Sequence, residues 1–158
     1  MLAATGCAVT APLSAAGEKV PRYQNQYGDE SGFGQETAGF ANCQLGDLYL
    51  DEYSGTTRSR YLQSLAGKRC DREDTLAQFC IAERFNGLKV IRLAVPKTTT
   101  PIFALYLDAD LETARATLKQ TLGSEFHASP ASAQGKVPEL IQDPENDRAS
   151  ILICTKQF

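Results

Sequence analysis

The five cysteines constrain the fold of this 158-residue chain more than any other feature. None of them belongs to a Cys-x-x-Cys pair, and the single histidine, His127, is far from all of them in the sequence. This spacing argues against a zinc site and against a redox motif. With Cys7 set aside, the remaining four are Cys43, Cys70, Cys80 and Cys154. Four is the even number that two disulfides need, so we expect a domain with two structural disulfides.

The composition is that of a globular chain with a core of its own. Hydrophobic residues make up 42% of the sequence and charged residues 22%, which is ordinary for one folded domain. The net charge of −3 and the pI of about 5.2 argue against a general attraction to nucleic acid. No apolar run approaches the roughly 20 residues that span a bilayer.

The beginning of the chain resembles a known targeting signal. The stretch AATGC, residues 3–7, resembles the lipobox of bacterial lipoproteins, in which small residues precede an invariant cysteine. The resemblance implies that Cys7 carries lipid and that residues 1–6 are the remnant of a signal peptide. Ala8 after the cysteine implies sorting to the outer membrane. We therefore expect a lipid anchor on the periplasmic face of the outer membrane.

The rest of the chain divides into a tether and a domain. Residues 7–40 are rich in Ala, Gly, Gln and Ser and have no sustained period, which predicts a lipid anchor followed by a flexible tether. Within them, aromatic side chains such as Phe33 and Phe40 are expected to lie back on the protein's own surface. Residues 41–158 are expected to form a single α+β periplasmic domain.

The apolar pattern of the domain predicts an order of elements. Alternation predicts strands over residues 44–53, 88–95, 102–108 and 150–158. Helical spacing and capping residues predict helices over residues 54–67, 71–87 and 111–123. The three prolines of residues 124–148 predict a long loop. This order matches the βαββαβ pattern of a ferredoxin-like split sheet, with helices on one face.

That topology suggests how the cysteines pair. The first and last strands would be antiparallel neighbours, which brings Cys43 near Cys154 and leaves Cys70 to pair with Cys80. A helix that begins at Arg72 would hold Cys70 and Cys80 too far apart, because Cα atoms must lie within about 7 Å. Either the helix begins later, near Thr75, or the pairing is crossed.

Two charged clusters are candidate sites. Carboxylates follow the first and third expected strands and comprise Asp51, Glu52, Asp108 and Asp110. Together they would suit Ca²⁺, or an acid/base pair acting on a glycan; separately they would cap a helix or face solvent. Basic residues cluster at Arg58, Arg60, Lys68, Arg69 and Arg72. They would face an acidic partner, or form the solvated face of two helices.

These features predict a binding protein without catalytic activity. We find no catalytic triad, no phosphate-binding glycine loop, no metal-ligand spacing and no cofactor motif. The sequence favours a non-enzymatic, lipid-anchored protein that binds an envelope protein partner in a periplasmic or secretion-type assembly. Strand addition is expected at the edge strand 88–95. The alternatives are a cell-wall glycan-binding module or weak hydrolase, and an inhibitor or immunity protein.

Overall fold

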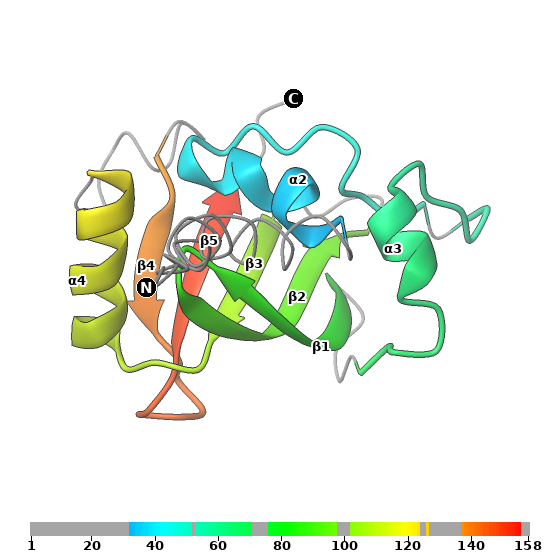
Figure 1. Ribbon diagram of the computed structural model, residues 1–158. Coiled ribbons are helices and arrows are strands. Elements are labelled where there is room, and N and C mark those ends of the chain that lie inside the picture. Colours follow the sequence, from blue (N-terminus) through cyan, green and yellow to red (C-terminus); the bar gives the residue numbers. More distant parts are fainter. Residues whose placement is uncertain are drawn as a thin grey trace, which may run out of the picture.

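The computed structural model describes residues 32–51, 53–70, 76–97, 102–123, 126 and 137–155. Its centre is a five-stranded antiparallel sheet in the order β1-β2-β3-β5-β4 (Figure 1). The strands are β1 (Leu76–Phe85), β2 (Leu88–Pro96), β3 (Ile102–Leu107), β4 (Glu139–Gln142) and β5 (Ser150–Thr155). The helices are α2 (Phe33–Thr37), η1 (Ala38–Ala41), α3 (Arg60–Ser64) and α4 (Leu111–Leu122). The chain therefore has a mixed α+β fold.

The core lies on one face of the sheet. A continuous row crosses all five strands and consists of Phe79, Leu93, Leu105, Leu152 and Leu140. Side chains from all four helices join the same buried cluster as this row. Because strand side chains alternate between faces, the next residues along the strands form a smaller second cluster. That cluster centres on Ala94, Ala104 and Ile151.

The predicted helix over residues 71–87 is wrong, because the described part of this segment is strand β1. Asn86 and Gly87 join β1 to β2, with φ angles of 48° and 88°. Positive φ at both positions is what a tight two-residue hairpin requires, and Asn-Gly supplies it at low cost. The apolar residues of β1 do not form one helical stripe, because Phe79 and Phe85 belong to the main core, Leu76 packs against the smaller cluster and Cys80 is exposed.

The ferredoxin-like strand order is not confirmed. Because residues 76–85 form a strand, β2 lies between β1 and β3 and is not the expected edge strand. The described part of the expected strand over residues 44–53 belongs to no strand of the sheet and forms a single bridge, from Asp51 to Thr56. Leu50 N donates to the Pro96 carbonyl at 3.3 Å, but proline has no N–H to continue a ladder.

Other expectations had mixed outcomes. The strands over residues 88–95 and 102–108 and the helix over residues 111–123 are confirmed, and α4 begins at its cap Asp110. The predicted loop over residues 124–148 contains β4. The described end of the predicted tether, from Gly32 to Phe40, is folded, since Phe33 and Phe40 are buried in the core. Residues 1–31, including Cys7, lie outside the described ranges.

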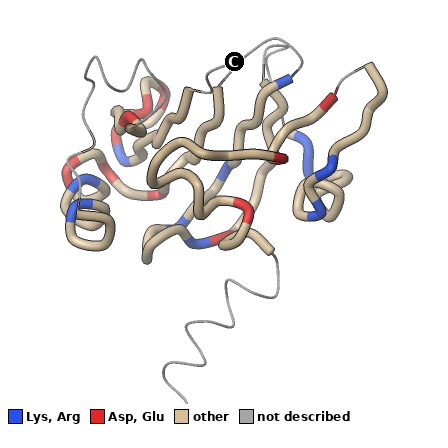
Figure 2. Tube along the Cα trace, turned by 90° about the horizontal axis from the view of Figure 1, so that it is seen from above, with Lys and Arg blue, Asp and Glu red and all other residues tan. Residues whose placement is uncertain are grey.

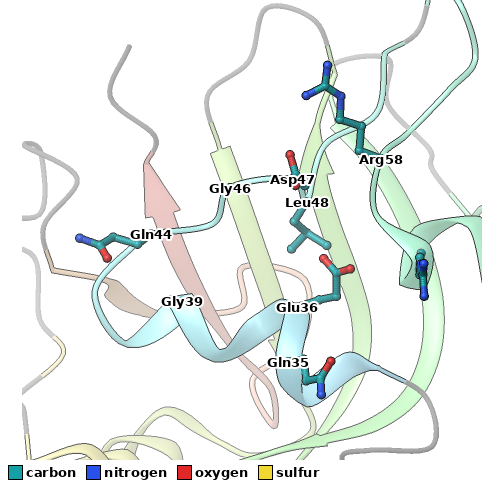
Figure 3. A pocket seen from close by; sticks show the side chains of 9 residues that line it. Gln35, Glu36, Gly39, Gln44, Gly46, Asp47, Leu48 and Arg58 are labelled. Atoms are coloured by element: carbon teal, nitrogen blue, oxygen red, sulfur yellow. The ribbon is translucent and has the colours of Figure 1, made fainter.

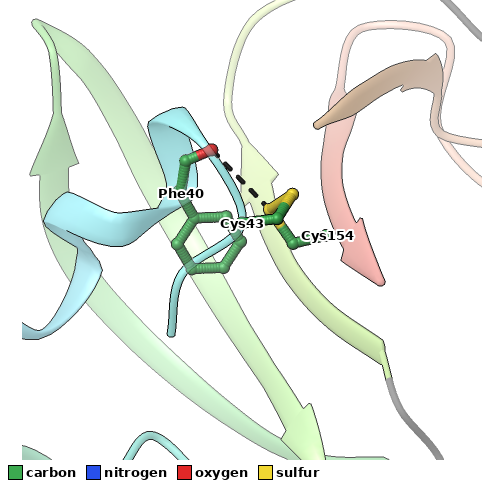
Figure 4. Close-up of a disulfide and its surroundings, with 3 residues drawn as sticks. All are labelled: Phe40, Cys43 and Cys154. Atoms are coloured by element: carbon green, nitrogen blue, oxygen red, sulfur yellow. Dashed lines mark hydrogen bonds between the residues drawn. A yellow bond between two sulfur atoms is a disulfide. The ribbon is translucent and has the colours of Figure 1, made fainter. Parts of the chain in front are cut away.

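Both predicted disulfides are confirmed. Cys43 bonds to Cys154, with Cα atoms 5.2 Å apart, and Cys70 bonds to Cys80, with Cα atoms 5.8 Å apart. The first bond fastens the turn after η1 to β5, and its Cys154 Sγ lies 3.6 Å from the carbonyl oxygen of Phe40 (Figure 4). The second bond is possible because Cys80 lies on a strand, which removes the obstacle that a helix would have posed.

Candidate functional site: a basic lobe beside strand β1

The structure does not bring the described carboxylates of the predicted cluster together. Asp51 lies near the Pro96 end of β2, because Leu50 bonds to Pro96. Asp108 lies near the other end, where its carboxylate is 3.2 Å from Lys89 Nζ. The two ends of β2 are roughly 23 Å apart at a strand rise of about 3.3 Å per residue. Asp51 and Asp108 therefore cannot share one cation or one glycan.

Each of these carboxylates has a local structural role where it is described. Asp110 accepts hydrogen bonds from Thr113 N and Oγ1, both at 2.9 Å, and these bonds lower the pKa of its carboxyl. The Ser54 hydroxyl, with the Tyr53 N–H, lowers the pKa of Asp51. Glu52 lies outside the described residues. Among the residues that are described, no three His, Cys, Asp or Glu side chains gather as a metal site.

The described residues of the predicted basic cluster fall on one lobe of the molecule. We call residues 53–70 the basic lobe, because they contain four positive charges and no Asp or Glu in a chain whose net charge is −3. The four are Arg58, Arg60, Lys68 and Arg69, all exposed, while Arg72 lies outside the described residues. In Figure 2, where Lys and Arg are blue, basic positions lie on the side of the molecule that α3 occupies in Figure 1.

Helix α3 holds the lobe against the core. Ser59 caps the helix, since its Oγ accepts from Leu62 N at 3.1 Å. Tyr61 is buried, packs edge-on against Phe33 and donates from its hydroxyl to Glu83 Oε1 at 3.2 Å. Burial, reinforced by the Glu83 carboxylate, raises the pKa of Tyr61 far above its ordinary value, so this phenol stays neutral.

The far end of the lobe is fastened to the edge of the sheet. Cys70 N donates to Gln78 O at 2.9 Å, and Cys80 N donates to Lys68 O at 3.0 Å, so residues 68–70 pair with β1. The Cys70–Cys80 disulfide locks this pairing covalently. The Arg69 guanidinium consequently lies 5.7 Å from the centroid of the Phe79 ring. This end of β1 is therefore covered, whereas sequence reasoning had expected an open edge on another strand.

A groove of ≈ 420 Å³ runs between α3 and β1. Its apolar lining comes from Leu50, Leu62, Ala66 and Phe79, and its polar rim includes Thr56 and Arg69. A volume of this order is typical of ligand pockets, which are mostly apolar with a few polar groups. Only the basic residues of this groove were identifiable from the sequence, because its walls come from segments that tertiary contacts bring together.

A second hollow, of ≈ 340 Å³, lies on the other side of the lobe (Figure 3). It is polar: Arg58 and Arg60 line it together with Glu36 and Asp47. The amides of Gln35 and Gln44 add hydrogen-bonding groups. The basic lobe thus separates an apolar groove from a polar hollow.

The first turn of the basic lobe presents an aromatic side chain. Tyr53 is 89% exposed, although its backbone is held by a bond from Tyr53 N to Asp51 Oδ1 at 3.0 Å. Ser54 and Thr56 complete the same hydrogen-bonded turn. An exposed tyrosine on a fixed turn is typical of an interface anchor. The Asp-x-x-Ser spacing at Asp51 was the available sequence signal for this turn.

The search for similar proteins found no match at any level. No family model matches the chain, no curated protein matches it, and no solved structure matches it. Within the described ranges, no helix combines the length and the apolar character needed to cross a bilayer. The function must therefore be inferred from the site itself.

Proposed function

We propose that this protein is a non-enzymatic, lipid-anchored component of the bacterial cell envelope, on the periplasmic face of the outer membrane. Its basic lobe binds an acidic surface of a partner protein in an envelope or secretion-type assembly. The observation that carries the binding role is the charge of the lobe. Four exposed cations without one carboxylate in residues 53–70 create a local positive field on a net acidic protein. Such a field steers and orients an oppositely charged partner.

The cysteines support the proposed location. Two disulfides are the expected state of a protein that folds in an oxidising compartment such as the periplasm. They occupy four of the five cysteines and leave Cys7, in its lipobox-like context, as the cysteine for lipidation.

Lipidation is tested by intact mass and membrane fractionation of the chain expressed in a Gram-negative host behind a functional signal sequence. We expect a membrane-bound protein whose mass includes a diacylglycerol and a fatty acid, both lost in Cys7→Ser. An unmodified protein in the soluble fraction would remove the anchor from the proposal.

Partner binding is tested by photo-crosslinking in intact cells from a probe at Tyr53, which is exposed at the start of the lobe. The pair Arg58→Glu and Lys68→Glu should abolish the crosslinked product. The matched pair Arg115→Glu and Lys119→Glu on α4 makes the same change of net charge away from the lobe and should retain the product. Equal products from both double variants would show that the lobe is not the binding surface.

A second candidate function, glycan binding, is favoured by the polar hollow. Carboxylates, guanidinium groups and amides in one depression suit a ligand rich in hydroxyl groups. A pulldown with insoluble cell wall tests it. Binding that is lost in Asp47→Asn and retained in Asp143→Asn would favour this function over partner binding.

A further inference from the structure

The groove beside α3 has features that the charge of the lobe alone does not explain. Its floor is made by Leu50, Leu62 and Phe79, from three different segments of the chain. Leu62 and Phe79 belong to the buried core, so the floor is rigid. A purely ionic surface would need no such apolar depression, because charges are recognised on the exposed rim.

The rim carries the positive charge. Arg69 lines the groove and stacks on Phe79, and Lys68 precedes it in the segment that is paired with β1. Arg58 lines the polar hollow on the other side of the lobe, so the cations at this rim are Lys68 and Arg69. An apolar floor with two cations at one rim is complementary to an apolar side chain with carboxylates next to it.

We propose that this groove binds an extended acidic segment of the partner protein, with one large apolar side chain inserted against Leu62 and Phe79. The carboxylates that flank this side chain lie toward Lys68 and Arg69. The proposal rests on the proposed function, since it names the chemistry of the partner that the basic lobe binds. An anionic polymer without apolar side chains matches the rim but leaves the floor empty.

Ala66 offers a clean way to perturb the groove. It is exposed at the end of α3 and lines the groove, and its side chain has no polar group to lose. Ala66→Glu places a carboxylate where the acidic segment binds, and Ala66→Gln places a neutral side chain of the same shape there. Ala116 on α4 is likewise exposed, so Ala116→Glu makes the same substitution away from the lobe.

The experiment is calorimetric titration of the full chain at low salt with three unlabelled peptides. The first is an acidic peptide with a central leucine, Gly-Asp-Glu-Leu-Asp-Glu-Gly. The second has serine in place of leucine, and the third has amides in place of the carboxylates. We expect the leucine peptide to bind at least about tenfold tighter than the serine peptide, because only it buries apolar area in the groove. The amide peptide should bind at least about tenfold weaker than the leucine peptide because it lacks the ionic contacts.

The variants then locate the binding. The affinity for the leucine peptide should be about tenfold lower in Ala66→Glu than in Ala66→Gln, because the new carboxylate repels the carboxylates of the peptide. Ala116→Glu should leave its affinity within about twofold of the unsubstituted chain.

Each contrary result overturns this proposal. Equal affinities for the leucine and serine peptides would mean that the lobe recognises charge only, and absence of binding would mean that the groove has another occupant. Equal effects of Ala66→Glu and Ala116→Glu would place the peptide elsewhere. The proposed function fails separately, when crosslinking to the natural partner does not depend on Arg58 and Lys68.

Discussion

The Cys43–Cys154 disulfide should contribute more to stability than the Cys70–Cys80 disulfide. A disulfide stabilises chiefly by restricting the unfolded chain, and this effect grows with the logarithm of the loop that it closes. The sequence separations are 111 and 10 residues. These separations correspond to about 4.8 and about 2.7 kcal/mol in the chain-entropy relation. The expected difference is therefore about 2 kcal/mol.

The structure indicates how the native state adds to this difference. Cys154 is 1% exposed and contacts Phe40, so its bond also holds η1 on the sheet. Cys80 is exposed at the edge of the sheet, where two backbone hydrogen bonds keep residues 68–70 in place without the bond. The loss of packing should thus be larger at the longer disulfide.

The measurement is urea unfolding of two double variants, Cys43→Ser with Cys154→Ser and Cys70→Ser with Cys80→Ser. The free energy of unfolding should fall by about 4–5 kcal/mol in the first and about 2–3 kcal/mol in the second. A domain is typically stable by about 5–15 kcal/mol, so the loss in the first variant should be a large fraction of the total stability. Reduced unsubstituted protein provides the control, because it loses both bonds without a change of sequence.

The reasoning would be refuted by equal losses in the two double variants, or by a larger loss from the Cys70–Cys80 pair. Either result would mean that loop entropy does not govern the contribution of these bonds. Comparison of the m-values guards against a false conclusion, since a changed m-value indicates an altered denatured state.

Three further predictions concern single residues. Gly39→Ala should lower the free energy of unfolding in urea by about 1–3 kcal/mol, because a Cβ there would lie 2.0 Å from the carbonyl oxygen of Gln44. Gly46→Ala is the control and should leave this free energy unchanged, because a Cβ there meets nothing within 4 Å. Tyr61→Phe should lower the free energy of unfolding by about 1 kcal/mol, because the hydrogen bond to Glu83 is lost. Absorbance at 295 nm should show the same number of ionising tyrosines up to pH 11 in the native variant, because the raised pKa keeps Tyr61 neutral in the unsubstituted protein. Asp110 should stabilise the protein above pH 3.8, its ordinary pKa, and this contribution should vanish as the pH falls through its lower folded pKa. Acid unfolding of Asp110→Asn, which keeps the cap but cannot ionise, should therefore be less dependent on pH in that range.

Contrary outcomes would be informative at each site. Equal stability of the two alanine variants would mean that the turn at Gly39 can widen. A tyrosine signal that falls in Tyr61→Phe below pH 11 would mean that the Tyr61 hydroxyl reaches water. An unchanged acid profile in Asp110→Asn would mean that the pH dependence comes from other carboxylates, such as Asp51.

Some parts of the fold could be predicted because local signals determined them. Helix α4 begins at Asp110 and ends at Gly123 as its capping residues indicated. Strands β2 and β3 lie where apolar residues alternate along the chain, which favours a strand over a helix. The Cys70–Cys80 pairing was chosen by elimination, and its apparent conflict with geometry arose from a wrong secondary structure.

Other parts failed where a local signal was ambiguous. In β1, the three-residue spacing of Leu76 and Phe79 satisfies a helical period, whereas in the strand these two side chains pack on opposite faces of the sheet. The Asn86–Gly87 pair ends a helix or turns a hairpin equally well by composition. Only the pairing of residues 76–85 with β2 decides between a helix and a hairpin. Because the sequence analysis predicts a helix there, it places β2 at the edge of the sheet, whereas β2 lies in the interior.

The sequence by itself determined the mixed α+β class, the boundaries of the well-capped helix and the existence of a basic segment, because these follow from neighbours along the chain. The tertiary structure alone decided the strand order, the separation of Asp51 from Asp108 and the groove between α3 and β1. The physical reason is that each of these depends on contacts between residues distant in sequence. Such contacts form because together they bury the whole core, and no single stretch of the chain is enough to predict them.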